Sequence, residues 1–410
     1  MKILHICCGH PLDAQGGVTN YVRTLAKTQF EHDNDVYILT TDGEDNGYSI
    51  IKYNTNLKIF NLKKRNDKEG LNQIKNILQE NNFDIIHIHM MLNIDFDLYK
   101  IIKPYNYIIS LHDYYLICPR ITMIAPGEKC CDKVTYKCDN CFSYLEANPI
   151  IGKICNKLLK SKTFSYRFPI KSHFYIDDWY SKNKKLLENA KCILPVSTRV
   201  KEIFENSGIK GNYLVTHIGN ISADEFDKIK DMNKKDNNIN IVYLSQFSEI
   251  KGGNLFCKIL ERVNNPNLKI HFYGKLTSKY QENLLKIHGI INHGSYKQTD
   301  LKSILAKMDM GVVMPIWEDN APQVVMEMLN NRIPILCTKM GGIPDFVNFD
   351  NGFLFNPFSE EEIEGAINFL ETLTIDKINN LKKNIRRTKT PLEHYLEMEK
   401  IYNEIIKKNI

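Results

Sequence analysis

The sequence has no long hydrophobic run. No apolar run among its 410 residues approaches the ~18 residues that a membrane-spanning helix needs. The first apolar run, Met1–Cys8, is too short and too soon interrupted for a signal peptide, and it is typical of a buried first strand. We therefore expect a cytoplasmic protein without a membrane-spanning helix.

The sequence also has little net charge. A formal net charge of +6 is too small to indicate nucleic-acid binding by itself, and we expect no nucleic-acid partner. Basic residues nevertheless gather between Ile151 and Tyr180, interleaved with aromatic residues such as Phe164 and Trp179. This mixture suits an anionic membrane surface or a lipid diphosphate, whereas a solvated helix with a packed apolar face explains it equally well. Peripheral contact with the inner face of the cell membrane is therefore an open alternative.

Length and pattern indicate two α/β domains. A single hydrophobic core stops growing beyond about 250–300 residues, so a chain of 410 residues favours two cores. Short apolar runs alternate with helical stretches, which is the pattern of parallel sheets built from βαβ units. The predicted strands are Lys2–Cys7, Asp35–Thr40, Ile85–His89, Tyr107–Ser110, Cys192–Val196, Ile239–Leu244, Lys269–Tyr273, Gly311–Met314 and Ile335–Cys337.

A polar segment separates the two halves. Asp227–Asn238 is rich in Lys, Asp and Asn and nearly free of apolar residues, so we interpret it as the domain linker. The predicted domains are therefore residues 1–226 and 239–387. Apolar residues recur at helical spacing in the last segment, residues 388–410, and this stripe must bury against other elements.

The segment after the strand that ends near Met314 is the strongest candidate for a site, because ligands of open α/β sheets bind at the carboxyl ends of strands. It turns through a polar loop into a helix that opens near Pro322, a residue suited to a first helical turn. Amide N–H groups at a helix start form an anion site. The carboxylates of Asp319 and Glu327 beside it suit sugar hydroxyls. Phosphate and sugar together suggest a nucleotide sugar.

Two adjacent glycines, Gly16 and Gly17, stand just before the first predicted helix. They let the backbone approach a ligand closely and expose N–H groups at a helix start, although a plain tight turn explains them as well. They do not form the Gly-x-Gly-x-x-Gly fingerprint with a later acid, so a nicotinamide cofactor is poorly supported.

Two further side chains follow strands. His112 can bond a sugar hydroxyl or take part in proton transfer, although a lone His is more often structural. Lys251 stands beside Gly252 and Gly253 at a loop-to-helix junction, where an ammonium group can clamp a diphosphate. An exposed loop Lys is more often only solubilising.

Taken in order, these motifs resemble glycosyltransferase family 4, the large group of retaining GT-B enzymes. The resemblance implies two Rossmann-like domains whose parallel sheets face each other across a cleft, with the last helix, about residues 388–410, packed back on the N-terminal domain. It runs from Met1 to about Phe355 and rests on Gly16-Gly17, His112, Pro195-Val196-Ser197, His217-Ile218-Gly219-Asn220, Lys251, Asp319 with Glu327, Gly341-Gly342-Ile343-Pro344-Asp345 and Asn351-Gly352-Phe353.

The resemblance also implies a role for each matched residue. Glu327 would bind the ribose hydroxyls of the donor, Asp319 would contact the transferred sugar, and His112 would lie near its reacting carbon. Lys251 would neutralise the leaving phosphate, a stabilisation of charge that the transfer requires, and the family needs no metal ion for catalysis. The diphosphate would bind the backbone of Gly16, Gly17 and the turn formed by Asn320, Ala321, Pro322, Gln323 and Val324.

Two positions depart from the family pattern. Gln246 stands in the phosphate site where family members usually have an Arg, and loss of a charged donor to phosphate typically removes ~1.5–3 kcal/mol. Asp319 stands in place of a Glu and is one methylene shorter.

The sequence thus predicts a retaining glycosyltransferase that moves a sugar from a nucleotide-diphosphate donor to a glycan or lipid-linked saccharide, in surface polysaccharide biosynthesis. Two alternatives stay open. One is a sugar-nucleotide epimerase of the same fold. The other is a non-catalytic family member, which Gln246 favours.

The chain has eleven cysteines, an odd number spread from Cys7 to Cys337. Without an export signal, this usage indicates reduced thiols rather than a disulfide framework. The pair Cys138-x2-Cys141 has the spacing of zinc ligands. Our hypothesis is a structural zinc held by thiolates from the cluster Cys118, Cys130, Cys131, Cys138 and Cys141, with reduced free thiols as the alternative.

The zinc hypothesis predicts about one zinc ion per chain, by metal analysis of protein purified without chelator, since a structural site uses about four ligands. Cys138→Ser should remove the metal, whereas Cys257→Ser, outside the cluster, should leave it bound. A zinc-to-protein ratio near zero in the unchanged chain would contradict the hypothesis.

Overall fold

The computed structural model describes residues 1–9, 16–41, 48–53, 58–62, 68–92, 97–118, 120–124, 176–229 and 238–408. They form two compact units, between which the chain passes twice. Unit 1 comprises Met1–Ile218 together with Pro391–Ile410, and unit 2 comprises Gly219–Thr390.

The first passage between the units lies ahead of the polar segment that we interpreted as the linker. It falls at Ile218 and Gly219. Asp227 belongs to a 3-10 helix of unit 2, η1 (Ile221–Lys228), and residues 230–237 lie outside the described residues.

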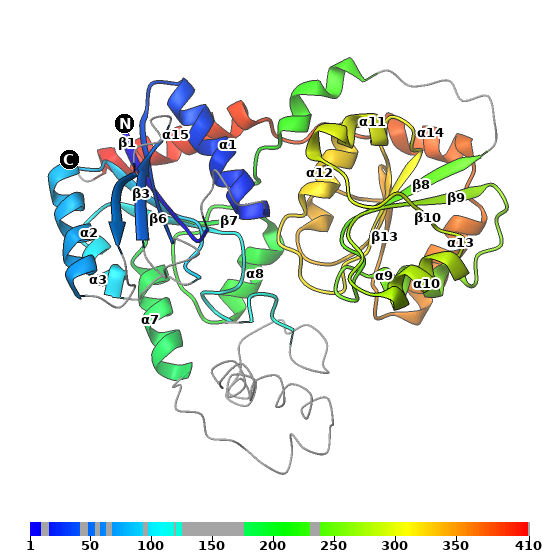
Figure 1. Ribbon diagram of the computed structural model, residues 1–410, viewed down its shortest axis with the longest axis horizontal. Coiled ribbons are helices and arrows are strands. Elements are labelled where there is room, and N and C mark those ends of the chain that lie inside the picture. Colours follow the sequence, from blue (N-terminus) through cyan, green and yellow to red (C-terminus); the bar gives the residue numbers. More distant parts are fainter. Residues whose placement is uncertain are drawn as a thin grey trace, which may run out of the picture. The chain divides into compact units, whose positions relative to one another are not determined.

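Unit 1 is built on a seven-stranded sheet (Figure 1). Its strands, in spatial order, are β4 (Lys58–Leu62), β3 (Tyr48–Lys52), β2 (Asp35–Thr41), β1 (Lys2–Cys7), β5 (Ile85–Ile88), β6 (Tyr107–Leu111) and β7 (Ile193–Pro195). β2, β1, β5, β6 and β7 pair with one another in parallel. β3 pairs antiparallel with β2, and β4 pairs antiparallel with β3. The central strands are buried on both faces, which explains their nearly continuous apolar sequences.

The last helix of the chain, α15 (Pro391–Lys407), belongs to unit 1 and lies along α1 (Gly17–Glu31) (Figure 1). Tyr395, Met398 and Tyr402 of its apolar stripe are buried, as the helical spacing requires. The other described helices of unit 1 are α2 (Lys68–Asn81), α3 (Asp97–Ile102), α7 (Ile176–Glu188) and α8 (Thr198–Asn206).

Unit 2 is built on a six-stranded, wholly parallel sheet. Its strands, in spatial order, are β10 (Ile291–Asn292), β9 (Leu268–Tyr273), β8 (Ile239–Leu244), β11 (Met310–Val313), β12 (Ile335–Thr338) and β13 (Gly352–Phe355). Alternate residues of β8 enter two apolar clusters: Tyr243 packs in one with Phe256, and Val242 packs in the other with Val325.

Helices therefore cover both faces of this sheet, as in doubly wound α/β domains (Figure 1). Besides η1, the described helices of unit 2 are α9 (Gly253–Leu260), α10 (Lys279–Ile287), η2 (Gln298–Asp300), α11 (Leu301–Leu305), α12 (Gln323–Asn330), η3 (Ile343–Asp345), α13 (Glu360–Glu371) and α14 (Ile375–Lys383).

The nine strands predicted from the sequence are all present, and their ends differ from the prediction by at most one residue. The sequence did not predict β3, β4, β10 or β13. β10 is only two residues long and exposed, and β13 is a four-residue strand whose apolar part is only Phe353–Phe355.

Asn330, at the end of α12, ties together the two segments by which the chain enters and leaves unit 2. It is fully buried, and its amide nitrogen donates to the hydroxyls of Ser222 (2.9 Å) and Thr388 (2.8 Å). Its amide oxygen accepts from the backbone N–H of Thr388 (2.8 Å). Asn220 N–H also donates to the carbonyl of Lys389 (2.9 Å), so the entering and leaving segments are bonded directly.

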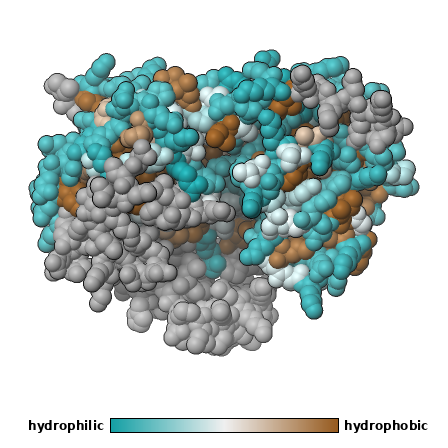
Figure 2. Space-filling view, turned by 45° about the horizontal axis from the view of Figure 1, so that its top comes forward, coloured by the Kyte–Doolittle hydropathy of each residue, from teal (hydrophilic) through white to brown (hydrophobic). Residues whose placement is uncertain are grey.

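On the face shown in Figure 2, the described residues are mostly hydrophilic, and apolar side chains lie in separate places. Within the described ranges, no helix is both long enough and apolar enough to cross a membrane.

Asn330→Ala should lower the free energy of unfolding of unit 2 by about 3 kcal/mol, because it removes three hydrogen bonds and leaves the backbone N–H of Thr388 unpaired in the interior. Denaturant unfolding of the full chain measures the change. Asn264→Ala, an exposed change in the same unit, should stay within about 0.5 kcal/mol of the unchanged protein. Equal effects of the two substitutions would contradict the role of Asn330.

Candidate functional site

The loop between β11 and α12 is the centre of the candidate site in unit 2. It leaves β11 at Val313 and ends at Pro322, the residue before the first turn of α12, so the helix opens where the sequence predicts. The amide groups of a first helical turn have no acceptor within their own helix. The turn that contains Gln323 and Val324 therefore lies at the positive end of a helix dipole.

The turn Gly341–Gly342 clamps this loop from one side. The N–H of Gly341 donates to the carboxylate of Glu318 (2.8 Å), and the N–H of Gly342 donates to the carbonyl of Asp319 (2.8 Å). Gly341 has a φ of 57°, and a Cβ atom there would lie 1.9 Å from the carbonyl oxygen of Asp319. Glycine is required for this approach, so the Gly-Gly motif fixes the backbone that carries Asp319.

The segment Ile250–Gly252 clamps the loop from the other side. The N–H of Ile316 donates to the carbonyl of Ile250 (3.0 Å). Gly252 has a φ of 80°, and a Cβ atom there would lie 1.8 Å from the carbonyl oxygen of Met314. This contact of two backbones sets the position of Lys251, whose carbonyl also accepts the hydroxyl of Tyr243 (2.7 Å).

Lys251 and Asp319, two predicted site residues, are in direct contact. The ammonium nitrogen lies 2.6 Å from Oδ2 of Asp319 and 5.2 Å from the ring centre of Trp317. The Lys251 side chain is 34% exposed, so a ligand can reach its ammonium group, whereas the Asp319 side chain is 13% exposed. The pair thus presents a positive charge whose position is fixed by a partly buried carboxylate.

Asn320 carries an unusual buried amide. The residue is 4% exposed, and among the described residues neither its oxygen nor its nitrogen has a hydrogen-bond partner. Buried polar groups are normally paired, and an unpaired one costs about 1–3 kcal/mol. Asn320 stands between Asp319 and the start of α12, so this unpaired amide lies directly beside the predicted ligand site.

Glu327 lies on the second turn of α12 and is 7% exposed. Its Oε1 accepts a hydrogen bond from the Gln298 amide (2.7 Å). Burial raises the pKa of the Glu327 carboxyl, and the bond from Gln298 opposes that rise. Burial, with the nearby Glu327, also raises the pKa of Tyr296 to about 12.

Gln246, the position where the resemblance implies an Arg, is exposed in the loop that follows β8. Within the described part of unit 2, the structure records no bond from Gln246 to Asp319 or Lys251. The neutral Gln246 side chain therefore does not supply the positive charge that an Arg guanidinium would have.

Gly16 and Gly17 stand at the start of α1, beyond the carboxyl end of β1 in unit 1. Both are exposed, and Gly16 is the N-cap residue of the helix. A Cβ atom added to Gly17 would meet nothing within 4 Å, so packing within the protein does not require glycine there. The close approach of a ligand to this glycine pair therefore stays a prediction.

His112 follows β6 at the same edge of the unit 1 sheet and is partly exposed. Its Nε2 lies 3.4 Å from Nδ1 of His89, and the ring of Tyr21 packs against it with centres 4.4 Å apart. In the neighbouring Asp113, one carboxylate oxygen accepts the N–H of Tyr115 (2.8 Å), and burial raises the pKa of this carboxyl to about 6.

Sequence reasoning did not identify Glu318, Gln298 or Trp317 as parts of the site. Glu318 stands beside the acid of the motif, but only the turn at Gly341 shows what it bonds. Gln298 lies in a polar segment without a motif, far along the chain from Glu327.

The cysteine cluster lies largely outside the described residues. Cys118 is described and partly exposed, whereas Cys130, Cys131, Cys138 and Cys141 are not described. Most of the basic stretch, residues 151–175, also lies outside the described ranges, so both hypotheses stay predictions.

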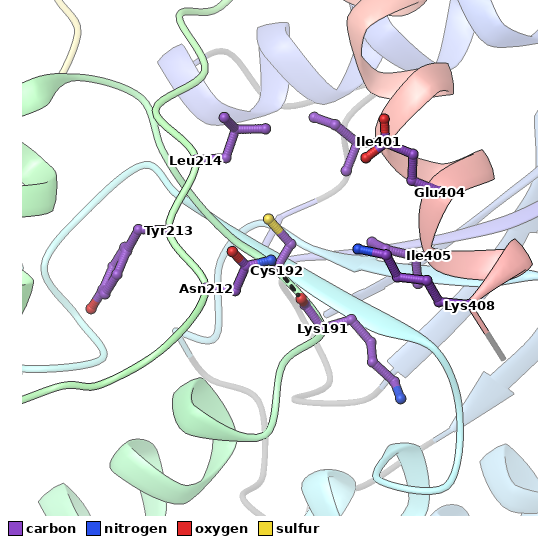
Figure 3. Close-up of a pocket in the computed structure, with 9 residues that line it drawn as sticks. All are labelled: Lys191, Cys192, Asn212, Tyr213, Leu214, Ile401, Glu404, Ile405 and Lys408. Atoms are coloured by element: carbon purple, nitrogen blue, oxygen red, sulfur yellow. Dashed lines mark hydrogen bonds between the residues drawn. The ribbon is translucent and has the colours of Figure 1, made fainter.

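A cavity of about 500 Å³ lies elsewhere in unit 1, at the amino end of β7 (Figure 3). One wall consists of Cys192, Asn212 and Leu214, and α15 supplies the opposite wall with Ile401 and Ile405. Because His112 and the glycine pair lie at the carboxyl edge of the sheet, this cavity is separate from the candidate residues.

Gly252→Ala should destabilise unit 2 by more than about 3 kcal/mol, because it adds a backbone clash to the strain of positive φ. Gly289→Ala is the matched control: Gly289 also has positive φ (63°), but an added Cβ meets nothing within 4 Å, so we expect about 1 kcal/mol. Denaturant unfolding of both variants isolates the clash. Equal losses would show that the contact with Met314 is not a constraint.

Comparison with known proteins agrees with this architecture. The family model described as Glycosyltransferase Family 4 matches residues 15–217, and the model described as Glycosyl transferases group 1 matches residues 224–388. Between them the two models match most of both units.

Individual relatives are distant. The chain is 26% identical over 144 residues to the sulfoquinovosyl transferase of Arabidopsis thaliana, and this match covers 33% of the chain and 27% of that protein. The matched part is thus only about a quarter of the length of that curated relative.

Solved structures share the fold over the full length. Sucrose-phosphate synthase from Thermosynechococcus elongatus has a TM-score of 0.66 at 14% identity, with 99% of both chains covered. Anabaena HepE, solved in complex with UDP, has a TM-score of 0.61 at 13% identity, with 98% of this chain and 100% of that chain covered.

The two parallel-sheet units, the clamped loop before α12 and the matched models lead to one assignment. The chain belongs to glycosyltransferase family 4 and has the GT-B fold.

Proposed function

We propose that the chain transfers a sugar from a nucleotide-diphosphate donor to a glycan or lipid-linked saccharide, with retention of configuration at the anomeric carbon. The observation that carries the donor class is the buried, unpartnered amide of Asn320, next to the Lys251–Asp319 pair and the start of α12. Surface polysaccharide biosynthesis as the setting rests on the family resemblance alone.

A diphosphate suits the groups around Asn320. The Lys251 ammonium and the first-turn amides of α12 supply positive charge and donors, and the Asn320 amide would gain the partner that it lacks among the described residues. Lys251 would then exchange part of its contact with Asp319 for a phosphate oxygen. The charge that develops on the leaving phosphate would thereby be stabilised without a metal ion.

The nucleoside and sugar ends of the donor suit the two carboxylates. Glu327 has one oxygen bonded to Gln298, and its remaining acceptor capacity suits ribose hydroxyls. Asp319 is held by Lys251 and by the clamp at Gly341, so its position beside a transferred sugar would be fixed. HepE was solved with UDP and, separately, with UDP-glucose, which supports a nucleotide sugar as the donor class.

The chemistry that we propose needs no covalent enzyme intermediate. The bond between the anomeric carbon and the phosphate oxygen breaks while a bond to the acceptor hydroxyl oxygen forms on the same face. The hydroxyl proton passes to the leaving phosphate. Asp319, the nearest carboxylate by family position, is paired with Lys251, which suits electrostatic support better than nucleophilic attack.

Gln246 favours one second candidate, a family member that binds without catalysing transfer. Incubation of the protein with nucleotide sugars, with and without saccharide acceptors, separates the candidates. Transfer requires the acceptor, an epimerase would convert the donor alone, and a non-catalytic protein would do neither. Failure to bind any nucleoside diphosphate by calorimetry would contradict the proposed donor.

Glu327→Ala should abolish stabilisation by the preferred nucleotide in a thermal-shift screen of UDP, GDP and ADP and their sugars, because the ribose loses its acceptor. Ligand at about 100 times Kd stabilises the folded state by about 2.7 kcal/mol, which raises Tm by roughly 5–11 °C for a domain of this size. Glu361→Ala, an exposed Glu of the same unit, is the control and should shift as the unchanged chain does. A full shift in Glu327→Ala would contradict the ribose assignment.

A further inference from the structure

A buried cluster of hydrogen-bonded imidazoles lies beneath His112 in unit 1. His5 comes from β1, His87 from β5, and His89 directly follows β5. All three are almost completely buried. Their neighbours are Gln29 of α1, Ser110 of β6 and Tyr402 of α15.

The geometry of the cluster suits hydrogen bonds better than a metal ion. The ligand atoms of His5, His87 and His89 lie within 4.8 Å of one another, a spacing that could hold a metal ion. However, both ring nitrogens of each histidine already lie at hydrogen-bond distance from a protein group. A metal would have to break these bonds, because it needs the lone pairs that they use.

Each imidazole of the cluster is neutral at physiological pH. Burial lowers the pKa of His5 to about 4 and that of His112 to about 3, and it also lowers the pKa values of His87 and His89. A neutral imidazole has one N–H donor and one lone pair. In a chain of such rings, the direction of one hydrogen bond therefore fixes the direction of the next.

The chain that ends at His112 begins at Gln29. The amide oxygen of Gln29 lies 2.7 Å from Nε2 of His5, and a carbonyl oxygen can only accept, so this nitrogen carries the hydrogen. Nδ1 of His5 must then accept from Nε2 of His89, 2.8 Å away. Nδ1 of His89 in turn accepts from Nε2 of His112, at 3.4 Å the longest link of this chain.

The orientation of the Gln29 amide is itself held by α15. Its nitrogen donates to the hydroxyl oxygen of Tyr402 (3.4 Å). That hydroxyl can then donate to Nδ1 of His87 (2.7 Å), and Nε2 of His87 donates to the hydroxyl of Ser110 (2.7 Å). Every bond in the network agrees with one amide orientation, and the reversed amide would reverse every bond.

We propose that Gln29 is a positioning residue that sets the tautomer of His112 through His5 and His89. The hydrogen of His112 is then on Nε2, inside the network, and its Nδ1 carries a lone pair. Among the described residues, no bond to Nδ1 of His112 is recorded. His112 is therefore an acceptor for a hydroxyl donor, such as a sugar hydroxyl, and not a donor to a phosphate oxygen.

Nitrogen NMR of the full chain, labelled with 15N-histidine and free of substrate at neutral pH, tests this assignment. Signals of His112 are identified by their loss in His112→Gln. The unchanged chain should show hydrogen on Nε2 and none on Nδ1. In Gln29→Met, which removes the acceptor with little change in size, the hydrogen should move to Nδ1 in at least half of the molecules. The reason is that Nε2 of His5 would otherwise bury an unpaired N–H.

Two substitutions of tyrosine on α15 complete the design. Tyr395→Phe removes a hydroxyl that bonds Asn34 and Glu399 outside the network, so it should leave the tautomer unchanged. If Gln29→Met does not fold, Tyr402→Phe replaces it, since it frees the Gln29 amide to rotate and should move part of the hydrogen to Nδ1. Hydrogen on Nδ1 in the unchanged chain, or an unchanged tautomer in the folded test variant, would overturn the proposal.

The importance of this tautomer for transfer rests on the proposed function, but the NMR measurement does not. If the chain is the proposed transferase, Gln29→Met should lower kcat about three- to tenfold, the value of one hydrogen bond, with the KM of the donor nearly unchanged. A chain without transferase activity could still show the predicted tautomers, so the two proposals fail separately.

Discussion

The approach of two glycine backbones to the loop before α12 is the constraint on which the site in unit 2 depends. Gly252 lies against Met314, and Gly341 lies against Asp319, each at a distance that excludes a Cβ atom. The three loops follow β8, β11 and β12, neighbouring strands of one parallel sheet, so their close approach is a property of the strand order. The positions of the charged side chains in the site therefore depend on backbone contacts, and movement of side chains cannot relieve a clash there.

This constraint also explains which parts of the site the sequence could reveal. The motif residues Lys251, Asp319 and Glu327 all follow strands with clear apolar patterns, and the helix at Pro322 has a recognisable start. The sequence therefore predicted nine of the thirteen described strands, a chain of two α/β units and the loop. It did not reveal that Lys251 contacts Asp319, because that contact depends on the order of strands in space rather than along the chain.

Contacts between residues remote in the chain account for the other gaps. Gln298 reaches Glu327 from a short helix with no motif, and the bond of Glu318 to Gly341 is invisible without the turn. In unit 1, His87 bonds Ser110 of β6 and Tyr402 of α15, and His89 bonds His5 of β1 and His112 after β6. Apolar periodicity identifies the buried faces of these elements and gives no information about which polar groups meet there.

The return of α15 to unit 1 has a consequence for synthesis of the chain. Unit 2 is one continuous segment, Gly219–Thr390, and its entering and leaving segments are bonded through Asn330. It can therefore form its sheet as soon as that segment has left the ribosome. Unit 1 begins before unit 2 but is completed after it, since Tyr21, Gln29 and His87 find partners on α15 only once that helix has been made. A nascent or truncated chain would thus hold a folded unit 2 while the imidazole cluster of unit 1 was still open to water.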